Sequence, residues 1–294
     1  METGRAPRAP RGQAAVAVVI DATDAEVKQL AAFVDGSIMV PEIRHHLWRS
    51  WGFCSRHTWL HAVVECELRA RPFGTAILYH DLTWRAARTI AGRARPRSWR
   101  IRRLASKDTC FTCDYLELSR VGAGSTGQPG DGGAGQAAYP AYPSGGEGQT
   151  AYPGSGEGQT AYPGGEKGRT AHPGGLTPAT GAPPNPVRTP TERVNARLRT
   201  TSFLAATRSE WEMRTCPKCL GGSGPMCRPH ILAGEEAPLD QTALTLAELA
   251  NRLGTYYRSC TWHGPTATPR DSASWVEALG WFAGWAYPAA LPLT

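Results

Sequence analysis

The sequence of 294 residues contains no apolar run that approaches the roughly 18 to 20 residues of a membrane-spanning helix. It therefore predicts no membrane partner. Alternating patterns of apolar and polar residues are also scarce, so we expect few strands. The pair Cys216 and Cys219 lacks the strand and helix context of a disulfide-exchange motif, and no motif in the chain identifies a substrate or a reaction.

A long internal segment lacks the residues that a core needs. Residues 122–186 contain a single large aliphatic side chain, Leu176, and no Phe, Trp or Cys. Within this segment a ten-residue unit recurs as SGGEGQTAYP, GSGEGQTAYP and GGEKGRTAHP. Such a composition cannot offset the roughly 1 to 2 kcal/mol per residue that ordering costs. We predict a disordered low-complexity insert over residues 122–190, a duplicated linker, with a tyrosine-bearing interaction tail as the alternative.

The remaining sequence divides into a basic disordered arm at residues 1–13 and two Cys/His blocks at residues 14–121 and 191–294. An apolar stretch, residues 14–20, follows the arginines of the arm and superficially resembles a signal peptide. It ends at Asp21 without a convincing cleavage site, so we expect the start of a strand or helix rather than export. We therefore predict a cytoplasmic protein, in which reduced cysteines act as metal ligands before they form disulfides.

Helix signals dominate both blocks, and we predict an all-α bundle of two metal-stapled halves. The ten tryptophans fall mostly in these helical segments and are expected to anchor helices to one another. The expected helices are a segment capped by Asp24 over residues 24–33, one starting at Pro41, one capped by Ser55, residues 73–90, residues 191–213, one with a capping box at Thr245 and Glu248, and a last helix starting at Asp271 or Ser272.

Cysteine and histidine spacing is the most informative pattern of the chain. Seven of the eight cysteines lie in pairs with a two-residue gap, which allows both members of a pair to reach one tetrahedral metal ion. The pairs are Cys54/His57, Cys110/Cys113, Cys216/Cys219, Cys227/His230 and Cys260/His263.

The second block offers a compact set of four candidate ligands, Cys216, Cys219, Cys227 and His230. They lie within fifteen positions, and the intervening LGGSGPM supplies glycines for a tight loop around an ion. Three thiolates and one imidazole are a common set for structural zinc, whereas iron–sulfur clusters usually use four thiolates. The spacing therefore favours zinc.

In the first block, Cys54, His57, Cys110 and Cys113 complete a second set if the intervening helices fold back. A competing assignment places Cys110 and Cys113 with Cys227 and His230 and leaves Cys216 and Cys219 as spare ligands. The chain is thus predicted to bind one or two structural zinc ions. Two further cysteines are expected to pack without metal: Cys260, with His263, has no partner pair, and Cys66 lies on an apolar helix face.

Three segments resemble an uncharacterised bacterial family known as a domain of unknown function. They are VPEIRHHLWRSWGFCSRHTWL, PMCRPHIL and the stretch from LAELANRL to ALGWFAGW. The family carries two Cys-x2-Cys plus Cys-x2-His half-repeats, and the resemblance implies a helical, zinc-binding protein with no assigned activity. It puts Cys54, His57, Cys110, Cys113, Cys227 and His230 at motif positions. This chain lacks the family's first Cys-x2-Cys pair, so one site is degenerate unless Cys110 and Cys113 complete it.

A basic segment suggests a second kind of partner. Nine basic and no acidic side chains lie between positions 82 and 107, and arginines interleaved with tryptophan can hold phosphates and stack on bases. The candidate contacts are Arg93, Arg95, Arg97, Trp99, Arg100, Arg102 and Arg103. We predict a zinc-stabilised interaction or regulatory module with a protein partner. The alternatives are a nucleic-acid-binding regulator using this segment, a zinc enzyme, or a thiol or metal sensor.

Overall fold

The computed structural model describes residues 21–92, 94–124, 188–261 and 266–291, and these residues form helices and turns without any strand. The predicted all-α fold is confirmed for this part of the chain. The basic arm, the apolar stretch at residues 14–20 and the decapeptide repeats lie outside the described residues. All described residues belong to one compact unit, which joins the two blocks.

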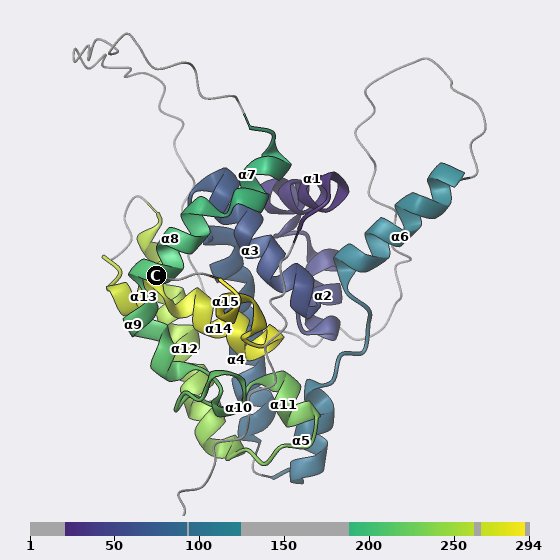
Figure 1. Cartoon of the computed structure of the whole chain (residues 1–294). Coiled ribbons are helices and arrows are strands. Elements are labelled where there is room, and N and C mark those ends of the chain that lie inside the picture. Colours follow the sequence, from purple (N-terminus) through teal and green to yellow (C-terminus); the bar gives the residue numbers. More distant parts are fainter. Residues whose placement is uncertain (1–20, 93, 125–187, 262–265, 292–294) are drawn as a thin grey trace, which may run out of the picture. The chain divides into compact units, whose positions relative to one another are not determined.

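The first block contributes six α-helices and a short π-helical turn (Figure 1). They are α1 (Asp24–Ala32), the π-turn η1 (Phe33–Ser37), α2 (Pro41–Ser50), α3 (Ser55–Arg69), α4 (Phe73–Ala91), α5 (Arg97–Leu104) and α6 (Phe111–Gly124). The second block contributes α7 (Pro190–Ala196), α8 (Leu198–Ala206), α9 (Arg208–Trp211), the 3-10 turn η2 (Glu212–Arg214), α10 (Pro217–Leu220), α11 (Arg228–Leu232), α12 (Leu239–Ser259), α13 (Pro269–Ser272), α14 (Ser274–Ala283) and α15 (Ala286–Ala289).

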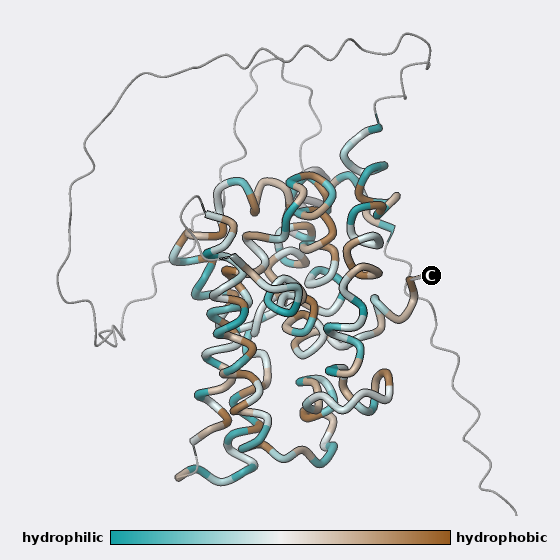
Figure 2. The backbone as a smooth tube through the Cα atoms, turned by 90° about the vertical axis from the view of Figure 1, so that its left-hand side faces the viewer, coloured by the Kyte–Doolittle hydropathy of each residue, from teal (hydrophilic) through white to brown (hydrophobic). Residues whose placement is uncertain are grey.

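The two blocks share one core. Helix α4 packs most extensively against α12, and α3 contacts α7, α8 and α14. Hydrophobic and hydrophilic residues alternate along the described helices, as expected of helices that bury one face (Figure 2). Tryptophans anchor this core as predicted: Trp275 is fully buried, Trp211 stacks on Trp285 with ring centroids 5.8 Å apart, and the indole N–H of Trp59 donates to the Gly284 carbonyl at 3.0 Å. The last bond joins the first block to the second.

Several helix boundaries differ from the predicted ones. The cap of α1 is Thr23 rather than Asp24, since Thr23 and Glu26 form a reciprocal capping box. Cys54 rather than Ser55 occupies the cap position of α3. Thr245 lies inside α12, where its hydroxyl donates to the Gln241 carbonyl one turn earlier at 3.1 Å and therefore caps nothing.

The long helix predicted over residues 191–213 is also interrupted. Arg197 adopts a positive φ of 54°, which ends α7 and starts α8 in a new direction. The buried carboxylate of Glu67 accepts hydrogen bonds from the backbone N–H and the hydroxyl of Thr200, both at 2.8 Å. Because the first N–H groups of a helix have no partner within it, a carboxylate from α3 stabilises this break.

Candidate metal centres

The first Cys/His cluster forms where two helix starts meet. Cys54 precedes α3 and His57 lies in its first turn, while Cys110 precedes α6 and Cys113 lies in its first turn. The four ligand atoms all lie within 4.8 Å of one another. Cys110 and Cys113 therefore meet Cys54 and His57, not Cys227 and His230 as in the competing assignment.

The distances within this cluster match those around one tetrahedral ion. The Nδ1 atom of His57 lies 3.4 Å from the sulfurs of Cys54 and Cys113 and 3.5 Å from that of Cys110. The sulfurs of Cys54 and Cys113 are 4.0 Å apart. With Zn–S of about 2.3 Å and Zn–N of about 2.0 Å, a tetrahedron requires about 3.8 Å between sulfurs and about 3.5 Å between sulfur and nitrogen. The four side chains can hold a metal ion without rearrangement.

The second cluster repeats this arrangement with ligands from α10 and α11. Its members are Cys216, Cys219, Cys227 and His230, again with all ligand atoms within 4.8 Å. The Nδ1 atom of His230 lies 3.5 Å from the sulfurs of Cys216 and Cys219 and 3.1 Å from that of Cys227. The sulfurs of Cys219 and Cys227 are 3.7 Å apart. Cys216 and Cys227 are completely buried. This cluster can also hold one metal ion.

The loop between the two cysteine pairs of the second cluster requires glycine. A Cβ atom on Gly224 would lie 1.9 Å from the carbonyl oxygen of Arg214, and one on Gly222 would lie 2.3 Å from the hydroxyl of Thr215. Both distances are below any van der Waals contact. Between α10 and α11 the backbone can pass this close to Arg214 and Thr215 only because positions 222 and 224 carry no side chain.

The histidine of the first cluster is held from behind by a carboxylate. With Nδ1 facing the three sulfurs, the proton resides on Nε2 and is donated to Glu26 Oε1 at 3.1 Å. Glu26 is itself fixed by Arg56, whose Nε and Nη2 atoms donate to it at 2.8 and 3.0 Å, and by the backbone N–H of Thr23 at 2.8 Å. Burial alone would raise the pKa of Glu26, but these hydrogen bonds outweigh it and lower the pKa to about 2.

Glu26 therefore stays ionised and orients His57, an arrangement typical of metal-binding histidines. Sequence reasoning missed this residue. Glu65 and Glu67, two buried acids of α3, do not serve the cluster but stabilise helix starts: Glu65 accepts from the backbone N–H of Thr75 at 2.8 Å at the start of α4, and Glu67 caps α8. The Thr23-x-x-Glu26 capping box was the available signal for Glu26. In the second cluster, Nε2 of His230 has no hydrogen-bond partner among the described residues.

Within each cluster the thiols share protons unequally. A hydrogen bond from the Cys110 thiol lowers the pKa of Cys54 and raises that of Cys110. In the second cluster, a hydrogen bond from Cys227 lowers the pKa of Cys219, and the pKa of Cys227 rises. Each cluster can thus form a thiolate beside further thiols, which is the charge state that attracts a soft divalent cation.

A buried arginine lies between the two clusters. Arg228, next to Cys227, is only 8% exposed and donates to the Leu104 carbonyl at 2.8 Å and to the Ser106 hydroxyl at 2.6 Å. Among the described residues no carboxylate pairs with it, and burial lowers its pKa to about 10. Arg228 lines a cavity of about 430 Å³ together with Cys54 and Cys110 of the first cluster. A buried cation without an acid partner suits a position beside thiolates, because three thiolates on a divalent ion leave one negative charge.

The remaining cysteines and histidines stay outside the clusters. Cys66 is a buried free thiol whose pKa is raised by burial, as predicted for a residue that packs. Cys260 is partly buried, and its partner His263 lies outside the described residues. His61 is completely buried, and its Nδ1 atom lies 3.1 Å from the Thr75 hydroxyl rather than near a ligand of the first cluster.

The basic segment forms α5 and the turn before it, and part of it is used within the protein. Arg97 donates to the Ala237 carbonyl at 2.7 Å, and Arg100 pairs with Asp240 at 2.9 Å. The exposed guanidinium groups of Arg95 and Arg103 lie 5.2 and 5.5 Å from the ring centre of Trp99. Arg102 is exposed, and Arg93 lies outside the described residues.

No protein-family model matches this chain, and no curated protein and no solved structure matches it. The resemblance to the bacterial domain family therefore stays a prediction. Within the described residues, no helix combines the length and the apolar character needed to cross a membrane. The class that the fold and the sites define is an all-helical protein with two Cys/His clusters that can each hold a metal ion.

Proposed function

We propose that each cluster binds one zinc ion and that the two ions stabilise the fold. The observation that supports this most strongly is the pair of three-cysteine, one-histidine sets whose ligand atoms lie at tetrahedral separations. Four protein ligands fill the coordination sphere of zinc, which is typical of structural rather than catalytic sites. This geometry favours a structural role over the zinc enzyme considered from the sequence.

The compactness of the clusters supports a single ion over an iron–sulfur cluster. All four ligand atoms of each set lie within 4.8 Å of one another, so they converge on one point. An iron–sulfur cluster places several iron and sulfide atoms between its ligands and usually has four thiolates. Three thiolates with one imidazole around one ion favour zinc.

The ions would join segments that are distant in the sequence or too short to be stable alone. In the first cluster, zinc would tie the start of α3 to the start of α6, across 59 residues from Cys54 to Cys113. In the second, it would hold two helices of four and five residues, α10 and α11, which are too short to be stable alone. The function that follows is a cytoplasmic interaction or regulatory module with a protein partner, whose binding surface the metals keep in shape.

Elemental analysis of purified protein tests this proposal. We expect two zinc equivalents in the wild type and one in each of Cys54→Ser and Cys216→Ser, because the substitutions affect different clusters. Cys66→Ala is the matched control, since this buried cysteine belongs to neither cluster, and it should retain both equivalents. Fewer than two equivalents in the wild type, or iron in place of zinc, would contradict the proposal.

A second candidate function is nucleic-acid binding by α5. It is favoured by Arg95 and Arg103, which lie over the Trp99 ring, and by the exposed Arg102; no carboxylate partner of these three arginines is found among the described residues. Charge reversal of Arg102 and Arg103 should weaken binding to single-stranded DNA and lower the salt slope by about one per lost phosphate contact. Affinity that is indifferent to salt and to both substitutions would remove this candidate.

A further inference from the structure

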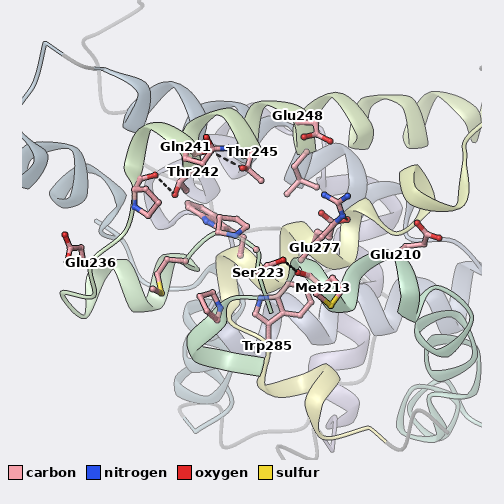
Figure 3. Close-up of a pocket in the computed structure, with 18 of the residues that line it drawn as sticks. Glu210, Met213, Ser223, Glu236, Gln241, Thr242, Thr245, Glu248, Glu277 and Trp285 are labelled. Carbon is pink, nitrogen blue, oxygen red and sulfur yellow. Dashed lines mark hydrogen bonds and ion pairs between the residues drawn. The ribbon is translucent and has the colours of Figure 1, made fainter. Parts of the chain in front are cut away.

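The two Cys/His clusters differ in how their sulfur atoms meet the cavities beside them. In the first cluster Cys54 is exposed, and Cys54 and Cys110 both line the cavity of about 430 Å³ that Arg228 also lines. A larger cavity, of about 720 Å³, lies beside the second cluster and is lined by α12, Trp281 and Trp285 (Figure 3). None of the four ligands of the second cluster is among the described residues that line it. Of these two cavities, only the smaller one leads a small molecule to a metal ligand.

The smaller cavity also offers a positive charge that is not fully used within the protein. Arg228 donates through Nε to the Leu104 carbonyl and through Nη2 to the Ser106 hydroxyl. Its Nη1 atom has no hydrogen-bond partner among the described residues, and it is not one of the unpaired atoms that are completely buried. Because Arg228 lines the cavity, Nη1 is open to it and can donate to an anionic group there.

The other groups around this cavity leave Arg228 free to hold an anion. Asp108 also lines the cavity, but its carboxylate is paired with Arg49 through two hydrogen bonds of 2.6 and 3.0 Å. Ser55, the first residue of α3, lines the cavity as well, and no side chain caps the N–H groups at this helix start. The positive end of a 15-residue helix therefore adds to the attraction of Arg228.

We propose that Cys54 is a modification site whose sulfur reacts with small electrophiles that carry a carboxylate. This inference rests on the proposed zinc site, because zinc keeps the sulfur as a thiolate, which is the nucleophilic form of cysteine. Nη1 of Arg228 holds the carboxylate. A lone pair of the Cys54 sulfur forms the new S–C bond, while the bond from that carbon to the leaving group breaks and its electron pair departs with the leaving group.

The product of this reaction is a neutral thioether. It has lost the negative charge with which a thiolate binds a divalent ion, so it is a weaker zinc ligand. Modification of Cys54 would therefore loosen the connection that the ion makes between the start of α3 and the start of α6. The second cluster would keep its ion.

Two reagents of nearly the same shape, the anion iodoacetate and the neutral iodoacetamide, test the proposal on full-length protein that holds two zinc equivalents. Mass spectrometry of peptides after partial alkylation gives the rate at each cysteine. Cys219 is the internal control, because it is a partly buried ligand of the same kind of set and does not line the cavity of Arg228. We expect the ratio of the iodoacetate rate to the iodoacetamide rate to be about tenfold higher at Cys54 than at Cys219. Equal ratios, or a Cys54 that reacts with neither reagent, would overturn the proposal.

Two variants separate the effect of Arg228 from that of overall charge. Arg228→Met should lower the ratio at Cys54 to that at Cys219 and change the iodoacetamide rate little. Arg88→Met removes an exposed charge of α4 outside the cavity, and this matched control should keep the wild-type ratio. An unchanged ratio in folded Arg228→Met would overturn the proposal; if that variant does not fold, the comparison of Cys54 with Cys219 in the wild type decides. Fewer than two zinc equivalents before alkylation would contradict the zinc assignment itself, and the inference with it.

Discussion

Replacement of Glu26 by glutamine should weaken metal binding in the first cluster alone. Glu26 accepts the Nε2 proton of His57 at 3.1 Å and is fixed by Arg56 at 2.8 and 3.0 Å. Glutamine is nearly the same size and can still cap α1, because capping boxes accept either residue. It removes the negative charge that makes the imidazole a better ligand and that pairs with Arg56.

The expected size of the effect follows from comparable sites. Loss of a carboxylate behind a ligating histidine typically weakens metal binding 10- to 100-fold, or about 1.4 to 2.7 kcal/mol. In wild-type protein, competition with a chromophoric chelator should release two metal equivalents. In Glu26→Gln, one equivalent should be released at 10- to 100-fold lower chelator concentration, while the other is unchanged because no carboxylate among the described residues accepts from His230.

Glu42→Gln is the matched control for this experiment. Glu42 is an exposed acid in the first turn of α2 and has no ion pair among the described residues. It should release both equivalents as the wild type does. The reasoning is refuted if Glu26→Gln keeps wild-type affinity at both sites, or if both sites weaken equally.

Three further substitutions test other parts of the structure. Gly224→Ala would place a methyl group 1.9 Å from the Arg214 carbonyl oxygen, so it should cost about 1 to 3 kcal/mol in thermal unfolding and reduce the metal content by one equivalent. Gly36→Ala is the control: the space around its Cβ position is open, so this variant should keep two metal equivalents. Arg228→Met leaves the carbonyl of the buried Leu104 without this donor and should cost about 1 to 3 kcal/mol in urea unfolding; an unchanged midpoint would argue against its role. Glu67→Gln should cost about 1.5 to 3 kcal/mol through the start of α8 but keep two metal equivalents, and loss of metal would show that Glu67 is more than a helix cap.

The spacing of cysteine and histidine carried most of the information about the candidate sites. Pairs such as Cys54 and His57 are local, so a two-residue gap at a helix start already places both side chains on one side of the backbone. Which pairs join could be predicted less well. The meeting of Cys54 with Cys113 depends on how α3 and α6 pack, and the sequence left two assignments open.

Features that depend on packing across the chain could not be predicted. Glu26 serves His57 because α1 packs on α3, and only its capping box indicated where its carboxylate points. Arg228 and the cavity beside Trp281 depend on contacts between segments far apart in sequence. Helix type was predicted well from apolar periodicity, but the break at Arg197 was not, because a carboxylate from α3 stabilises it.

The melting temperature before and after metal removal tests the central claim most directly. Structural zinc in small domains contributes about 10 to 16 kcal/mol, which is comparable with the whole stability of a typical domain. Protein treated with a strong chelator and then freed of it should melt about 20 °C lower or more, lose helical circular dichroism, and recover both on addition of two zinc equivalents. An unchanged melting temperature and helicity in protein shown to be metal-free would contradict the account.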